Sequence, residues 1–237
     1  MAGATTDILQ TLETLGLHWD GDVDYQSQHL DEYHAVLDDL MRRKQIYRCR
    51  CSRKELTDIY AQTCRNKIIS TAEAHSLRIK TDAQQIMFDD NLQGHISHDL
   101  ALQHGDFILK RKDNIVAYQF AVVIDDARQS VNHVVRGMDL LNETPKQIYL
   151  QQILNLPIPN YLHVPILVDA KGYKLSKQTL ATAVDLTTPN QVLLQLLNWL
   201  KQNPPPELKY ENVSEILTWA IKNWDISHLR NIKQITV

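Results

Sequence analysis

Residues 163–178 read HVPILVDAKGYKLSKQ, and this stretch says more about the fold than any other part of the chain. Its apolar run, 164–168, predicts a short strand that enters a loop at Gly172, a residue that disfavours helix. The loop presents a serine between two lysines: Lys174, Ser176 and Lys177. Lysines in loops are most often merely solvated. At the end of a strand, however, their compact charges on flexible stems suit the phosphates of a nucleotide.

Helical and strand-like segments alternate along the chain. Apolar residues recur with the helical period over 5–15, 30–44, 145–154, 190–201 and 213–224, and a helical stretch is expected over 68–73. Thr5 or Thr6 is the expected cap of the first helix. Strand-like segments occupy 77–80, 85–88, 95–96, 107–111 and 131–135, with the apolar segment 115–124 among them. Strands interleaved with helices predict an α/β fold.

Composition is that of an ordinary soluble globular protein. The chain has 237 residues, of which 43% are hydrophobic and 22% are charged. Its longest apolar runs are far too short to span a bilayer, so no membrane partner is expected. No secretory signal is visible at the N-terminus. Three cysteines, an odd number, do not make a disulfide framework and predict a reducing, cytoplasmic setting.

Charge is unevenly distributed. The net charge of −3 gives no general argument for nucleic-acid binding. Residues 42–67 nevertheless hold nine basic residues against two acidic ones: Arg42, Arg43, Lys44, Arg48, Arg50, Arg53, Lys54, Arg65 and Lys67 against Glu55 and Asp58. This asymmetry is compatible with a phosphate-backbone contact and equally with a solvated helix face. Because the seven glycines are scattered, a nucleotide would be held by basic side chains rather than by a glycine-rich backbone cradle.

All three cysteines lie within sixteen residues, in YRCRCSRKELTDIYAQTC. Cys49 and Cys51 can bind one ion from a tight turn, and Cys64 can return from a short helix. Zinc requires four tetrahedral ligands, so one more donor is needed. Tyr60 lies one helical turn before Cys64, and His75 and water are the competing candidates. The alternative is that the cysteines are reduced and serve as small buried hydrophobic residues.

Several segments occur together in one order: LGLHWDGDV (15–23), QSQ (26–28), CRC, AYQFAVVIDD (117–126), VVRGMDLL (134–141), TPKQ (144–147) and YKLSKQ (173–178). Together they resemble the glutamyl-Q tRNA(Asp) synthetases, bacterial paralogues of glutamyl-tRNA synthetase that lack the anticodon-binding domain. The resemblance spans nearly the whole chain. The Lys-Leu-Ser-Lys order is similar to the second ATP-binding signature of class I aminoacyl-tRNA synthetases.

The resemblance implies a role for each matching residue. It places zinc ligands at Cys49, Cys51, Tyr60 and Cys64, glutamate-binding residues at Tyr118 and Arg136, and ATP-binding residues at Lys174, Ser176 and Lys177. The implied reaction activates L-glutamate with ATP as glutamyl-adenylate and transfers glutamate to the queuosine base of tRNA(Asp). Catalysis would rest on positioning and electrostatics, with no catalytic nucleophile among the side chains. A monomer is expected.

The implied architecture is a Rossmann catalytic domain of the class I synthetase type with a zinc-binding insertion and a helical C-terminal part. Residues 1–135 would form a partial Rossmann domain, with the insertion at about 45–110. Residues 136–180 would form the second Rossmann half with the KLSKQ loop, and residues 181–237 the helical part.

The sequence departs from the family pattern at its start. The family opens with a strand and a glycine-rich, histidine-containing ATP loop, the HIGH signature, followed by an Arg-x-Glu-Asp segment. Neither is present here. We therefore expect the first strand to be missing, either because the sequence starts inside a longer reading frame or because it is a truncated form with weak or no activity. The alternatives are a non-catalytic, zinc-stabilised tRNA-binding remnant and an α/β domain whose lysines and cysteines are incidental.

Overall fold

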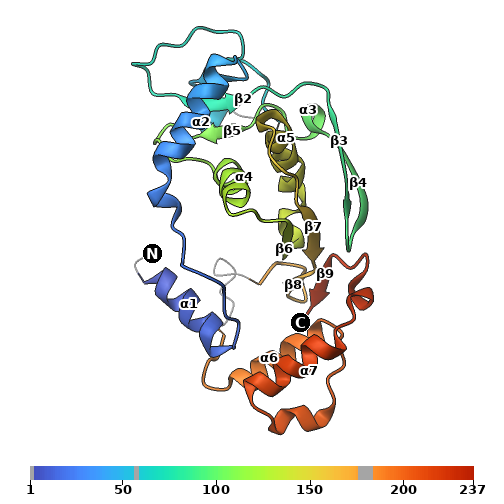
Figure 1. Cartoon of the computed structure of the whole chain (residues 1–237). Coiled ribbons are helices and arrows are strands. Elements are labelled where there is room, and N and C mark those ends of the chain that lie inside the picture. The colour runs from blue at the N-terminus through green and yellow to red at the C-terminus, as the bar shows by residue number, and fades with distance from the viewer. Residues whose placement is uncertain (1–2, 56–58, 176–183) are drawn as a thin grey trace. The chain divides into compact units, whose positions relative to one another are not determined.

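The structure is a computed structural model that describes residues 3–55, 59–175 and 184–237 (Figure 1). The chain forms two compact units, one of residues 1–23 with 164–237 and the other of residues 24–163. These limits differ from the boundaries expected at 135/136 and 180/181, and that division into parts stays a prediction. Among the described residues, no helix is long and apolar enough to cross a membrane.

Two sheets lie in the described part of unit 24–163. One has the order β1-β2-β5, with antiparallel pairs and Ile46 opposite Ile79. The other has the order β4-β3-β7-β6; β3 and β4 form an antiparallel hairpin, and β7 runs parallel to β3. Their bounds are β1 Ile46–Cys49, β2 Ser76–Ile79, β3 Gln85–Asp90, β4 Gly94–Asp99, β5 Ile108–Lys110, β6 His133–Gly137 and β7 Asn160–Val164. This mixture of sheets and helices confirms the predicted α/β class.

The helices of this unit bury one apolar face each against a shared core. They are α2 Leu30–Arg42, α3 Leu100–Gln103, α4 Tyr118–Arg128 and α5 Thr144–Leu154, with the short helices η1 Gln26–Gln28, η2 Arg53–Glu55 and η3 Met138–Glu143. Leu40, Phe120 and Leu150 are fully buried in the same cluster as Ile79 of β2 and Ile86 of β3. Apolar burial of this kind is the main stabilising contribution to the unit.

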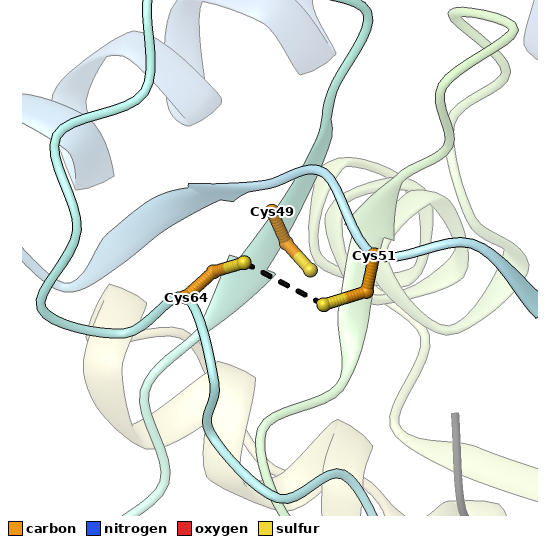
Figure 2. A group of neighbouring side chains, drawn as sticks. All are labelled: Cys49, Cys51 and Cys64. Carbon is orange, nitrogen blue, oxygen red and sulfur yellow. Dashed lines mark hydrogen bonds between the residues drawn. The ribbon is translucent and has the colours of Figure 1, made fainter. Parts of the chain in front are cut away.

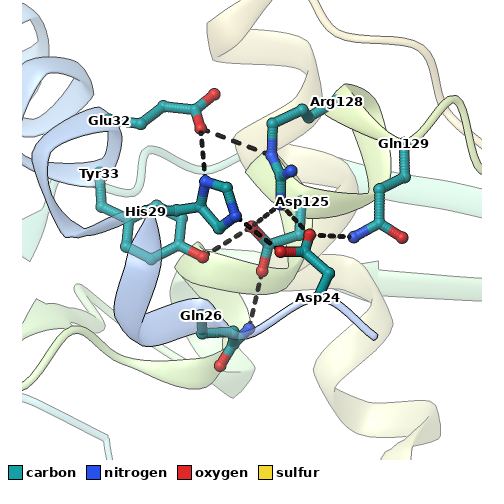
Figure 3. Close-up of polar contacts among 8 residues, drawn as sticks. All are labelled: Asp24, Gln26, His29, Glu32, Tyr33, Asp125, Arg128 and Gln129. Atoms are coloured by element: carbon teal, nitrogen blue, oxygen red, sulfur yellow. Dashed lines mark hydrogen bonds and ion pairs between the residues drawn. The ribbon is translucent and has the colours of Figure 1, made fainter. Parts of the chain in front are cut away.

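A polar network holds α4 against residues 24–33, which include η1 and the first turn of α2 (Figure 3). The buried carboxylate of Asp125 accepts hydrogen bonds from the Tyr33 hydroxyl at 2.6 Å and the Gln26 amide at 2.8 Å. Arg128 donates to both Asp125 and Asp24. Burial, followed by the bond to Asp125, raises the pKa of Tyr33 well above its usual value, so the phenol keeps its proton. The network therefore fixes the orientation of α4, whose first residue is a predicted site residue.

The other unit combines helices with a short parallel pair of strands. Its elements are α1 Ala4–Thr14, β8 Ile166–Val168, α6 Pro189–Trp199, η5 Pro206–Tyr210, α7 Val213–Asn223, η6 Ile226–Leu229 and β9 Gln234–Thr236. Helices α6 and α7 lie side by side (Figure 1). Leu15, which follows α1, packs in one cluster with Leu193 and Leu197 of α6 and Ile216 of α7.

Gly16 turns the chain out of α1 at a place where no side chain fits. Its φ is +69°, and an added Cβ would lie 2.8 Å from Val213 and 2.9 Å from Leu217. Gly21 has a similar φ of +72° with open space around it.

We expect Gly21→Ala to lower the free energy of unfolding by about 1 kcal/mol, which is the cost of the backbone conformation alone. Gly16→Ala adds overpacking and is expected to cost about 2–4 kcal/mol. Equal midpoints for the two variants in urea unfolding would contradict the predicted clash.

Four local predictions differ from the structure. The first helix begins at Ala4 with Gly3 as its N-cap, so neither threonine caps it. Residues 68–73 are not helical. Ile69 packs into the cysteine cluster, and the side chain of its neighbour Ile68 is fully exposed. The 115–124 segment, grouped with the strands, is helical from Tyr118 onward. The strand predicted over 164–168 is divided between β7 and β8 at Pro165, which has no N–H to donate.

Candidate functional site

The three cysteine thiols point toward one another in unit 24–163 (Figure 2). Cys49 ends β1, Cys51 follows two residues later, and Cys64 returns after a loop. The sulfur atoms all lie within 4.8 Å of one another, and those of Cys51 and Cys64 are 3.5 Å apart. The close spacing in the sequence therefore becomes a compact set of soft donors, the kind that zinc prefers.

The Tyr60 hydroxyl joins this set. It lies 3.3 Å from the Cys49 sulfur and 3.6 Å from the Cys51 sulfur, and it accepts the backbone N–H of Cys64 at 2.9 Å. Burial, and then the neighbouring thiols, raise the pKa of the phenol far above its usual value. Tyr60 therefore keeps its proton among free thiols, and a cation would have to displace that proton to gain the oxygen as a ligand.

Arg78 supplies positive charge beside the cluster. Its guanidinium carbon lies 3.9 Å from the centre of the Tyr60 ring. Burial alone would raise the pKa of Cys49, but hydrogen bonds from Tyr60 and the backbone of Cys51, together with Arg78, lower it to about 7. Burial raises the pKa of Cys51. Because the thiolate is the metal-binding form, Cys49 is the thiol best prepared to bind an ion near neutral pH.

These four donors fit a tetrahedral zinc ion. Three thiols and one phenol converge, and they also form a small hydrophobic cluster with Tyr47 and Ile69. His75, the competing fourth ligand, is not in the converging group; its Nδ1 is 2.7 Å from the backbone oxygen of Glu73. The donor chemistry therefore favours Tyr60 over His75.

Arg136 projects from β6 toward polar side chains of α5 and β7. Its Nη2 donates to the Thr144 hydroxyl and to the Gln147 side-chain oxygen, both at 2.8 Å. Its Nε lies 3.1 Å from Nε2 of His163. Its guanidinium carbon is 5.5 Å from the centre of the Tyr161 ring. Arg136 is therefore not a surface ion pair but a part-buried cation held on three sides.

Tyr118 is the first residue of α4, and 49% of its surface is exposed. Burial raises the pKa of Tyr161, a buried tyrosine that lies beside Arg136. Asp126 also belongs to this region: burial raises the pKa of its carboxyl, and Arg136 opposes that rise.

Buried partners of Arg136 were not among the predicted site residues. Thr144 and Gln147 are 0% and 2% exposed, and both lie in the TPKQ segment that contributed to the resemblance. His163 begins the stretch 163–178, yet no sequence pattern predicted its contact with Arg136. It is fully buried against the carboxylate of Asp90. Tyr161 and His163 face the same buried side of β7, an arrangement that the sequence of this strand alone does not specify.

The lysine loop lies in the other unit. After β8 the chain turns at Asp169, whose side chain accepts the backbone N–H groups of Lys171 and Tyr173 at 2.9 Å. Gly172 has a φ of +82°, and Lys174 pairs back with Val168 across the turn. The turn therefore presents Lys174 at the end of a strand, as predicted. Ser176 and Lys177 lie outside the described residues.

Comparison with known proteins gives a consistent result. The family described as tRNA synthetases class I (E and Q), catalytic domain, matches residues 1–193. A glutamyl-Q tRNA(Asp) synthetase of Aromatoleum aromaticum is 41% identical over 94% of this chain and 74% of its own length. The protein of the same name from Methylococcus capsulatus is 44% identical over 97% of this chain and 78% of its own length.

Solved structures show the same fold. A glutamate tRNA ligase from Elizabethkingia meningosepticum, in complex with its amino acid, matches all of this chain with a TM-score of 0.74 and 18% identity. A glutamate-tRNA synthetase from Elizabethkingia anophelis matches with a TM-score of 0.75 and 18% identity. The chain spans 57% and 58% of the length of these two proteins. The predicted class I synthetase-like α/β fold is confirmed.

Proposed function

Because the chain belongs to the class I glutamyl- and glutaminyl-tRNA synthetase family, and within it to the glutamyl-Q tRNA(Asp) synthetases, we propose that it activates glutamate with ATP and transfers the glutamyl group to the queuosine base of tRNA(Asp). Two steps would make up this reaction. A glutamate carboxylate attacks ATP to form glutamyl-adenylate and pyrophosphate. The queuosine base then displaces AMP.

The guanidinium of Arg136 is the observation that carries the proposal. Three of its N–H groups are occupied by His163, Thr144 and Gln147, and the two on Nη1 have no hydrogen-bond partner among residues 3–55, 59–175 and 184–237. A part-buried cation with two unpaired donors suits a carboxylate. Tyr118, exposed at the start of α4, would add a phenolic hydroxyl to the same amino acid.

ATP would be held by the lysine loop. Lys174 is presented by the turn after β8, and Ser176 and Lys177 follow directly in the sequence. Lysine ammonium groups would neutralise charge that develops on the phosphates during adenylate formation. Orientation of glutamate and ATP would then account for most of the rate, since the proposed reaction needs no side-chain nucleophile.

Zinc would be held by Cys49, Cys51, Tyr60 and Cys64. When bound, the ion would cross-link the end of β1 to the loop that returns at Cys64. Exposed basic residues lie close to the cysteines in the sequence, among them Arg50, Lys54 and Lys67. They would give the segment a positive surface for the phosphates of tRNA(Asp). The same surface supports the second candidate function, a zinc-stabilised tRNA-binding protein without catalysis.

Glutamate-dependent exchange of labelled pyrophosphate into ATP tests the enzymatic proposal. We expect exchange with L-glutamate and none without an amino acid, because the adenylate step is reversible and needs the amino-acid carboxylate. The same preparation is assayed for binding to tRNA(Asp). Binding to tRNA without any amino-acid-dependent exchange would favour the second candidate function.

A further inference from the structure

A buried aspartate–histidine pair lies behind Arg136. Nδ1 of His163 is 2.6 Å from Oδ2 of Asp90, and both side chains are fully buried. The other carboxylate oxygen of Asp90 accepts the backbone N–H groups of Leu92 at 3.0 Å, Gln93 at 2.8 Å and His163 at 3.3 Å. Burial alone would raise the pKa of Asp90, but these bonds lower it. Asp90 is therefore an ionised acceptor, and Nδ1 of His163 carries a proton.

The opposite ring nitrogen lies beside the guanidinium of Arg136 and the hydroxyl of Thr144. Nε2 of His163 is 3.1 Å from Nε of Arg136 and 3.1 Å from the Thr144 hydroxyl. An arginine Nε always carries a hydrogen and cannot accept a hydrogen bond. Nε2 must therefore present its lone pair. The imidazole is neutral, with its proton directed to Asp90, an arrangement that also orients metal-binding and catalytic histidines in other proteins.

This bond determines where the free donors of Arg136 point. The guanidinium is planar, so fixing the Nε–H direction and both hydrogens of Nη2 fixes the position of Nη1. Among the described residues, Asp126 feels the charge of this guanidinium, and the centre of the Tyr161 ring lies 5.5 Å from its carbon. Tyr161 also stacks on His163 with ring centres 6.2 Å apart and an interplanar angle of 16°. The imidazole therefore has little freedom to rotate away from Arg136.

We propose that His163, held by Asp90, is a positioning residue that aims Nη1 of Arg136 at the carboxylate of bound glutamate. The inference rests on the proposed function, since glutamate is the ligand of Arg136. It adds two hydrogen bonds in series, from Asp90 of β3 to His163 of β7 and from His163 to Arg136 of β6. Neither Asp90 nor His163 would touch the substrate. The competing explanation is that the pair only stabilises the sheet.

Two substitutions of His163 separate these explanations. Glutamine can place its side-chain oxygen near the position of Nε2, so His163→Gln keeps an acceptor for Arg136. Asparagine is shorter and places its amide near Nδ1, so His163→Asn keeps a donor for Asp90 and loses the contact with Arg136. Both variants remove the ring and its stacking on Tyr161, so a purely structural role would weaken both to a similar extent.

Steady-state pyrophosphate exchange is measured with glutamate and ATP varied in turn, alongside thermal unfolding. We expect His163→Asn to raise the KM for glutamate by about 10- to 100-fold, the range for a lost hydrogen bond to a charged group. Its KM for ATP should stay within about twofold, and His163→Gln should recover most of the glutamate KM. Equal glutamate KM values for the two variants, whether normal or raised, would overturn the inference.

The native protein provides the reference that separates this inference from the proposed function. If the native protein catalyses no glutamate-dependent exchange, the proposed function is wrong and the inference falls with it. If the native protein exchanges normally and His163→Asn retains the native glutamate KM, only the inference is wrong.

A ¹⁵N–¹⁵N coupling across the hydrogen bond between Arg136 Nε and His163 Nε2 is expected in the native protein. Its absence would also overturn the inference.

Discussion

Arg136→Lys is expected to lower kcat/KM for glutamate by about two orders of magnitude in pyrophosphate exchange. Lysine keeps the positive charge but has no planar fork. It cannot reproduce the three bonds to His163, Thr144 and Gln147 while also presenting two donors to a carboxylate. The loss should fall mainly on the KM for glutamate, because the contact with the amino acid is present before the adenylate forms.

Arg42→Lys is the matched control for this change. Arg42 is a surface residue whose side chain is 76% exposed and which is paired with Asp39 at 3.0 Å. Its substitution should leave both the glutamate KM and the thermal midpoint unchanged, since exposed ion pairs contribute little. If Arg136→Lys retained the native glutamate KM while remaining folded, Arg136 would not be the glutamate-binding residue.

Cys64→Ser is expected to abolish zinc binding and to lower the free energy of unfolding by about 3–5 kcal/mol. Serine is a poor zinc ligand, and Cys64 is buried in one small cluster with Tyr47, Tyr60 and Ile69. The purified native protein should contain about one zinc ion per chain. Metal analysis and urea unfolding, with and without a chelator, measure both effects; the chelator should destabilise the native protein and not the variant.

Two further variants identify the fourth ligand. Tyr60→Phe removes only the phenolic oxygen and should weaken zinc binding, whereas His75→Ala should leave it unchanged. The reason is geometric, because the Tyr60 hydroxyl lies 3.3 Å from the Cys49 sulfur and His75 is not in the converging group. Zinc loss in His75→Ala with full retention in Tyr60→Phe would reverse the assignment.

Local sequence patterns predicted two parts of the candidate site that are built from residues close together in the chain, the cysteine cluster and the loop that carries Lys174. The spacing of Cys49, Cys51 and Cys64 predicted their convergence, and the described structure places the three thiols together. The strand followed by a glycine turn predicted the loop that carries Lys174, and the turn at Gly172 has the positive φ that glycine accepts readily. Both are short-range features, since each is built within a few residues of one strand end.

Features that depend on strand pairing could not be predicted in this way. Asp90 and His163 are 73 residues apart and meet only because β3 and β7 pair in parallel with Asp90 opposite Tyr161. No local pattern specifies that register. The helix predicted over 68–73 is absent, and Ile69 packs instead from an irregular segment into the cysteine cluster, a tertiary contact that local propensity does not specify. The glutamate-binding roles of Tyr118 and Arg136 came from the family resemblance and stay predictions.

Transfer of labelled glutamate to tRNA(Asp) tests the central claim most directly. The protein is incubated with ATP, labelled glutamate and either queuosine-containing or queuosine-free tRNA(Asp), and each product is cut with a ribonuclease to locate the label. The proposed function predicts label only with the queuosine-containing tRNA and only in the anticodon fragment. Label in the 3′-terminal fragment, or equal labelling of both tRNAs, would contradict it.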